Sequence, residues 1–193
     1  MTKTARMLTA AATALLAGVA LTGCTINLGS TSGEHDMGMM DENKGGYTAD
    51  DIMFMQMMIP HHQQAVDMGT LAETRASNPK VKALAAQIKA EQAPEIAEMK
   101  QWLKDAGAGM TMSHSMTMSG MLTEAEMTKL ENSTGAEFDR LYLEGMIGHH
   151  EGAIEMAKMV IDSKTANTHA LGHAINDSQT KQIAYMKELL AKL

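Results

Sequence analysis

The sequence MIPHHQQAVDM, residues 58–68, returns 88 residues later as MIGHHEGAIEM, residues 146–156. Six of the eleven positions are identical, and both copies hold two adjacent histidines between methionines. Apolar residues at helical spacing surround each copy, which predicts that each lies in a helix. The repetition indicates that the chain contains two equivalent structural units.

The same periodicity predicts four long helices and one short helix. The residues from Leu84 to Leu103 correspond to those from Leu171 to Leu190 at an offset of 87, so the helix after each histidine motif is repeated as well. No alternation typical of β-strands occurs. We therefore expect an all-α fold, a four-helix bundle made of two duplicated helical hairpins. The expected ranges are about 48–76, 79–106, 136–163 and 167–192, with a short helix that starts at the capping box Thr123–Glu126.

Residues 1–24 have the features of a lipoprotein signal peptide: a positively charged start, an apolar stretch and the sequence LTGC at its end. Cys24 is the only cysteine of the chain, and its position predicts that it becomes the lipid-bearing N-terminus. Residues 25–46 are rich in Ser, Thr, Gly and Asn and are expected to form a flexible tether. We therefore expect an exported protein, anchored through Cys24 to the outer face of the cell membrane or to a periplasmic membrane surface. Its helical domain is expected at 47–193.

Charge and composition exclude one class of partner. The formal net charge is -7 at pH 7, and aromatic residues make up 3% of the chain. Nucleic-acid binding requires a basic surface, so we expect no nucleic-acid partner. An acidic surface is compatible with binding cations, although it also serves solubility. Since there is no second cysteine, neither a disulfide nor a zinc site of several thiolates can form within the chain.

The two histidine pairs are the first candidates for metal ligands. They are His61 and His62, then His149 and His150, with Met58 and Met146 one turn before them. Neighbours on a helix point about 100° apart, so one histidine of each pair should face into the bundle and the other toward a flank. Imidazole binds several transition metals, whereas thioether sulfur selects soft ions, above all Cu(I). The pattern favours copper or silver. The alternative is a buried histidine hydrogen-bonded to a carboxylate, with methionine as core filler.

The segment between the two hairpins, residues 107–121, is a second candidate site. Its potential ligands are Met110, Met112, His114, Met116 and Met118, set among Gly, Ser, Thr and Ala. Such a setting has poor helix propensity, so core packing of a helix does not explain these methionines. A pliable backbone could instead wrap several thioethers and one imidazole around a single Cu(I) or Ag(I) ion. Scavenging of oxidants by methionine is the other interpretation.

Other chemistries find less support in the sequence. A di-iron bundle requires Glu-x-x-His motifs, and no bundle histidine has an acidic residue three positions before it. His169 and His173 have a spacing compatible with zinc, but their counterparts in the first repeat are not histidines, so we assign them a surface or auxiliary role. Glu91 and Glu95 are expected on solvated helix faces. Since no catalytic constellation is recognisable, we predict that the protein is not an enzyme.

The chain resembles the family called domain of unknown function 305, whose members are ferritin-like helical bundles. The resemblance covers about residues 47–193 and rests on the two histidine motifs and the segments Phe138–Tyr142 and Gln92–Trp102. Exported members of the family are linked to copper binding and resistance. The resemblance extends this role to the two histidine pairs and the nearby methionines, whereas the methionine-rich linker is an addition of this chain.

Together these features predict a lipid-anchored, extracytoplasmic protein that binds Cu(I) and Cu(II), and also Ag(I). It would sequester the metal or pass it to a copper-accepting protein partner. The main alternative is a structural or signalling bundle without metal, in which the methionines act as oxidant sinks. A redox enzyme that uses a metal in the bundle is a third interpretation.

Overall fold

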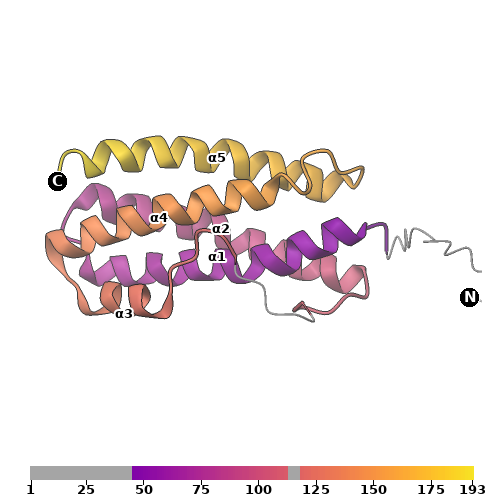
Figure 1. The fold of residues 1–193 in the computed structure, drawn as a ribbon, viewed down its shortest axis with the longest axis horizontal. Helices are drawn as coiled ribbons and strands as arrows, with labels where there is room; N and C mark the ends of the chain where they lie inside the picture. The colour runs from indigo at the N-terminus through magenta and orange to yellow at the C-terminus, as the bar shows by residue number, and fades with distance from the viewer. Residues whose placement is uncertain (1–44, 113–117) are drawn as a thin grey trace, which may run out of the picture. The chain divides into compact units, whose positions relative to one another are not determined.

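The structure is a computed structural model that describes residues 45–112 and 118–193. Within these residues it consists of five helices and contains no β-strand (Figure 1). The helices are α1 (Ala49–Arg75), α2 (Pro79–Asp105), α3 (Glu124–Asn132), α4 (Gly135–Ala157) and α5 (Ala166–Leu190). The predicted signal peptide with Cys24, most of the predicted tether, His114 and Met116 lie outside the described residues. None of the described helices is long and apolar enough to cross a membrane.

The four long helices form a bundle of two hairpins. Helix α1 packs along α2, α4 packs along α5, and the hairpins meet through α1 and α4 (Figure 1). In contrast, α2 and α5 make few close backbone contacts with each other. The short helix α3 lies against α4 and belongs to the connection between the hairpins. The predicted all-α, four-helix bundle is thus confirmed.

The predicted helix ends agree with the structure within a few residues, except at the end of α4. This helix was expected to reach residue 163, but it ends at Ala157. From Lys158 onward the backbone amides bond three rather than four residues back, which turns the chain tightly. Val160 then packs on α5, where a Cβ on Gly172 would lie 2.9 Å from its Cγ2 atom. The early end therefore brings the α4–α5 connection close to α5.

Two buried aspartates at equivalent positions join the hairpins. Asp51, near the start of α1, completes a capping box with Thr48 and also accepts hydroxyl hydrogen bonds from Ser163, Thr165 and Thr168 in the α4–α5 region. Burial acts to raise the pKa of Asp51, but these hydrogen bonds together hold it below its usual value.

Asp139, near the start of α4, accepts hydrogen bonds from the backbone amides of Ser77 and Asn78 and from the Ser77 hydroxyl. Asp51 and Asp139 occupy equivalent positions of the repeat, 88 residues apart. Asp51 caps its own helix and also binds the connection of the opposite hairpin, whereas these hydrogen bonds of Asp139 all come from the connection of the opposite hairpin. Equivalent carboxylates of the two repeats therefore connect the hairpins by hydrogen bonds.

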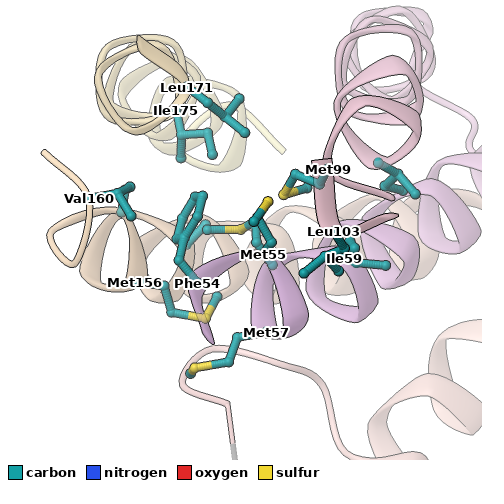
Figure 2. Packing of buried hydrophobic residues seen from close by; sticks show 14 of the residues in the cluster. Phe54, Met55, Met57, Ile59, Met99, Leu103, Met156, Val160, Leu171 and Ile175 are labelled. Atoms are coloured by element: carbon teal, nitrogen blue, oxygen red, sulfur yellow. The ribbon is translucent and has the colours of Figure 1, made fainter. Parts of the chain in front are cut away.

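In the described part of the chain, the core contains two apolar clusters. The first cluster includes Phe54, Met55, Met57, Met58, Met99, Leu103, Met156, Val160, Leu171 and Ile175 (Figure 2). The second cluster includes Met68, Leu84, Ile88, Phe138, Tyr142, Leu143, Met146 and Met186. Both draw on all four long helices, so each cluster holds the two hairpins together by burying apolar surface.

A polar layer separates the two clusters. In α1 the first cluster ends at Ile59 and the second begins at Ala65; in α4 the second ends at Met146 and the first resumes at Ala153. Helices α2 and α5 show the same interruption at the same level. The buried residues of this polar layer are His61, His62, Gln92, His149, His150, Gln179 and Gln182. Burying so many polar groups opposes folding unless they are paired, so the layer points to a role other than stability.

Candidate metal centre

The four predicted histidines are the centre of the polar layer, and each has 0% of its surface exposed. His61 of α1 and His149 of α4 face each other across the hairpins, with ring centroids 3.8 Å apart. His149 also donates from Nε2 to the backbone oxygen of His61 at 2.9 Å. The first histidines of the two motifs therefore meet at the contact between the hairpins.

The second histidine of each pair points toward the other helix of its own hairpin and not toward solvent. His62 Nε2 lies 2.8 Å from Oε2 of Glu95 on α2, and His150 Nε2 lies 2.7 Å from Oε1 of Gln182 on α5. The amide of Gln182 donates in turn to Glu91 at 2.6 Å, which fixes which of its ends faces His150. One histidine of each pair was expected to face a flank of the bundle, and the side that it faces is the neighbouring helix of its hairpin.

The hydrogen bonds decide where each imidazole carries its proton. Every Nε2 atom of the four faces an oxygen acceptor, and His61 Nε2 donates to the backbone oxygen of Ser119 at 3.2 Å. In a neutral imidazole only one ring nitrogen bears a proton, so Nδ1 is left with a free lone pair. All four Nδ1 atoms are buried and have no hydrogen-bond partner among residues 45–112 and 118–193. The layer therefore holds four unpaired nitrogen lone pairs inside the bundle.

Burial keeps three histidines of this layer, His61, His149 and His150, neutral at neutral pH. It lowers the pKa of His61 to about 3, with a further lowering by the neighbouring His62. The pKa of His150 falls to about 4, mainly through burial, and that of His149 falls well below its usual value through burial and the adjoining imidazoles. At neutral pH protons therefore do not compete for these Nδ1 lone pairs, which leaves them available to a metal ion.

The lone pairs share one layer without converging in a ready-made cage. Among the described residues, no group of three or more His, Cys, Asp or Glu side chains is arranged to hold one ion. This arrangement does not fit a metal that needs a closed set of such ligands, as structural zinc does. It leaves room for sites of few ligands or of mixed imidazole and thioether donors, the kind that Cu(I) accepts.

Methionines lie on both sides of the polar layer. Met58 is fully buried in the first cluster, and Met146 is fully buried in the second. Both are therefore core residues as well as neighbours of the histidines in sequence. Core packing or metal binding alone would account for their burial. The two roles are compatible because thioethers pack like aliphatic side chains.

The linker methionines pack on the bundle more closely than the sequence indicated. Met112 and Met118 are half-buried against the first cluster, whereas Met110 is 45% exposed. Met57 and Met156 of that cluster point toward the side on which the linker runs (Figure 2). Core packing of a helix was rejected as an explanation for the linker methionines, and Met112 and Met118 indeed lie outside the helices, but both pack partly on the bundle. These two linker methionines thus pack on a cluster that itself contains Met57 of α1 and Met156 of α4.

The end of the linker is fastened over the polar layer. Gln64 exchanges two hydrogen bonds with the backbone of Leu122, at 2.8 and 2.9 Å, next to the bond between His61 and Ser119. Gly152 makes this approach possible, since a Cβ there would lie 1.9 Å from the Ser119 oxygen. The equivalent residue of the first motif is Gln64. The two repeats therefore differ at this position, and the glycine occurs in the repeat whose helix the linker crosses.

Two surface clefts along the α2–α5 side reach the hydrogen-bond partners of the histidines. One, of about 420 Å³, is lined by Glu95, Glu98, Trp102, Asn167 and residues around them. The other, of about 370 Å³, is lined by Glu91, Gln182, Lys181, Tyr185 and their neighbours. The buried imidazoles are thus connected to the surface through Glu95 and through Gln182 with Glu91.

Sequence reasoning missed three residues of this site: Glu95, Gln182 and Ser119. The side chain of Glu95 is only 22% exposed and pairs with His62, so its expected place on a solvated helix face was wrong. The repeat itself contained the signal, because Glu95 and Gln182 are equivalent at the offset of 87 that relates α2 and α5. No local pattern could have shown that the Ser119 backbone oxygen bonds to His61.

Solved structures with the same fold include metal-bound ones. A DUF305 protein from Streptomyces coelicolor, assigned as secreted, is 33% identical over 74% of this chain and 93% of its own, with a TM-score of 0.71. A DUF305 fragment from Deinococcus radiodurans is 28% identical over 76% of this chain and 98% of its own, with a TM-score of 0.69. The protein CopM in its Cu(I)-bound form is 31% identical over 74% of this chain and 96% of its own, with a TM-score of 0.63.

CopM has been solved in Cu(II)-bound and Ag-bound forms too. No curated protein matches this chain. The family model described as domain of unknown function (DUF305) matches residues 51–190, which include α1 from Asp51 onward, the other three long helices and both histidine motifs. The chain belongs to the DUF305 family.

Proposed function

We propose that this protein binds copper outside the cytoplasm, as Cu(I) and Cu(II), and also binds Ag(I). The observation that carries the proposal is the set of four buried Nδ1 atoms that form no hydrogen bond with any described residue. Leaving buried acceptors unpaired costs about 1–3 kcal/mol each. A fold that keeps four of them in one layer gains from a ligand that accepts their electron pairs.

The surroundings favour a soft, singly charged ion in the polar layer. Transfer of a charge into a buried site is costly, and the cost rises with the charge. The carboxylates nearest to the imidazoles, Glu95 and Glu91, lie at the edge of the layer, where each is half-buried. Thioethers border the layer in both clusters, and sulfur of this kind selects Cu(I) and Ag(I). Cu(I) therefore suits the interior better than Cu(II).

The likeness to CopM supports the same conclusion independently of the geometry. That protein carries Cu(I), Cu(II) and Ag in its solved forms, and this chain shares the fold and about a third of the aligned residues. We extend the metals to this chain because its own histidines and methionines provide suitable donors.

Export and anchoring complete the proposal. The predicted signal peptide and Cys24 would hold the helical domain at the outer face of the cell membrane or at a periplasmic membrane surface. There the protein would sequester copper or deliver it to an accepting protein. The proposal includes no enzymatic turnover.

A titration of the full chain with Cu(I), in competition with chromophoric chelators of graded affinity, tests the proposal. We expect binding that survives a weak competing chelator and that falls when His61 and His149 are replaced by Gln. A variant in which His169 and His173 are replaced by Gln serves as the matched control, since both lie outside the layer. Failure of the parent chain to take Cu(I) from the weakest chelator would refute the proposal.

The alternative of a bundle without metal has one observation in its favour, namely that each Nε2 atom is already hydrogen-bonded. In that case the histidines act only in the fold, and the methionines consume oxidants. The thermal unfolding temperature separates the two. Cu(I) should raise it if copper binds the native state, and should leave it unchanged if the layer is structural only.

A further inference from the structure

Two histidines on the outer surface of α5 lie outside the polar layer. His169 and His173 are four residues apart, so they occupy the same face of the helix on successive turns. Both are exposed, and their ring centroids are 4.7 Å apart in an edge-to-face arrangement. Two imidazoles at this distance can turn their nitrogens toward one common ion without any change in the backbone.

No other role is apparent for this pair in the described part of the chain. Neither ring takes part in a side-chain hydrogen bond there, and neither belongs to an apolar cluster. The equivalent positions of the first hairpin are Lys82 and Ala86, so the duplicated fold does not require histidine at either place. Asp177 lies a further turn along the same exposed face and adds negative charge.

We propose that His169 and His173 form a second metal site, which chelates a divalent ion of the borderline class on the surface of α5. Two histidines four apart on a helix are a known pair of ligands for such ions. Among the first-row divalent metals, Cu(II) binds nitrogen donors most tightly. The expected occupant is therefore hydrated Cu(II), with water filling the remaining positions.

This site differs from the polar layer in access and in chemistry. The buried imidazoles have thioether neighbours and no open contact with solvent, whereas the α5 pair is exposed and has no thioether within one turn. A copper ion already held by a bulky chelator can reach the α5 pair but not the layer. The two sites can therefore be tested separately, and the surface site stands even if the layer binds no metal.

The test is binding of the full chain to Cu(II)–iminodiacetate, a chelate that leaves coordination positions open. The parent chain should carry H35A and H114A, so that its only other histidines are the four buried ones. H173A should then weaken binding at least about tenfold, because the second imidazole acts at high effective concentration. The electron paramagnetic resonance spectrum of the parent should show coupling to two nitrogens from imidazole, and that of H173A to one.

A matched control keeps the number of surface histidines constant. In the double variant H173A/A170H the two histidines are neighbours and diverge, so chelation is lost. Its binding should equal that of H173A. If the double variant binds as tightly as the parent, or if H169A/H173A retains the parent's affinity, the site does not exist. Cu(I) titration of H169A/H173A should remain unchanged, which separates this result from failure of the proposed function.

Discussion

Glu95 and Gln182 have equivalent roles in the two hairpins, since each accepts a hydrogen bond from Nε2 of a buried histidine. Glu95 accepts from His62 at 2.8 Å, and Gln182 accepts from His150 at 2.7 Å. One acceptor is a carboxylate and the other is an amide whose orientation Glu91 fixes. Both fix the ring so that Nδ1 carries the lone pair. Partners of this kind orient metal ligands, and their loss typically weakens metal affinity.

Replacing Glu95 by Ala should therefore affect both stability and copper binding. It leaves the buried N–H of His62 without an acceptor, which should lower the free energy of unfolding by about 1–3 kcal/mol. Cu(I) affinity should fall roughly 10–100-fold if His62 is a ligand. Urea unfolding and chelator competition measure the two effects.

Two variants sharpen this prediction. E95Q keeps an oxygen acceptor, as Gln182 does for His150, so its loss of stability should be smaller than that of E95A. E98A removes an exposed carboxylate from the same cleft and should change stability by no more than about 0.5 kcal/mol. If E95A and E98A changed the free energy of unfolding equally, the hydrogen bond between Glu95 and His62 would not contribute to stability.

Acid should unfold the metal-free protein in a pH window set by the buried histidines. The pKa values of His61, His149 and His150 are lowered on folding, so the unfolded chain binds more protons below its ordinary histidine pKa of about 6.5. Stability is then complete above about pH 6.5. It falls by about 1.4 kcal/mol per histidine and pH unit as the pH drops toward 4. Urea unfolding followed by circular dichroism, at pH values from about 7.5 to about 4.5, would show how the free energy of unfolding changes with pH.

His150 provides the control for this slope. H150Q removes one titrating group, so the decline per pH unit should become shallower by about 1.4 kcal/mol. A stability that stays level from about pH 6.5 to 5 in the parent chain would contradict the burial of these neutral imidazoles. Bound Cu(I) should move the acid transition to lower pH, because it holds the native state.

The repeat made the fold predictable from the sequence. Periodicity and the two offsets placed the four long helices, and Thr123 with Glu126 placed the start of α3, because capping and amphipathic patterns are local. The end of α4 could not be predicted from the local sequence. It depends on Val160 packing against Gly172 and on Asp51 binding Ser163, contacts that join residues far apart in the chain.

The candidate site was predictable in its residue types and less so in its arrangement. The motif identified His61 and His149, but the contact between their rings depends on how the two hairpins meet. The hydrogen-bond partners of the four histidines come from α1, α2, α5 and the linker, which no spacing within the motif reveals. The linker was expected to be a second candidate site, but the sequence did not show that it crosses the layer, where Gly152 leaves space for Ser119.

Gly152→Ala should therefore displace the linker from the polar layer. The added Cβ would lie 1.9 Å from the Ser119 oxygen, a separation that forces the backbone to move. We expect loss of the bond between His61 and Ser119 and a fall in stability of about 1–3 kcal/mol. Hydrogen exchange at Leu122, whose amide bonds to Gln64, should become faster.

Gly148→Ala is the matched control, since it lies one turn earlier on the same helix. Its Cβ would meet nothing within 4 Å, so this change should stabilise the helix by up to about 1 kcal/mol. If both variants behave alike, the effect at Gly152 would reflect helix propensity and not the crossing of the linker.

Replacing Met112 and Met118 by Leu separates the roles of the linker methionines in packing and in metal binding. Leucine has nearly the same volume, so the free energy of unfolding should change by less than about 1.5 kcal/mol per substitution. Cu(I) and Ag(I) affinity should nevertheless fall by at least about tenfold if these thioethers are ligands, whereas Cu(II) binding should be retained. M186L makes the same exchange in the second cluster, away from the linker, and should leave Cu(I) affinity unchanged. Equal Cu(I) affinity in M112L/M118L and M186L would show that the linker methionines serve only to pack against the bundle.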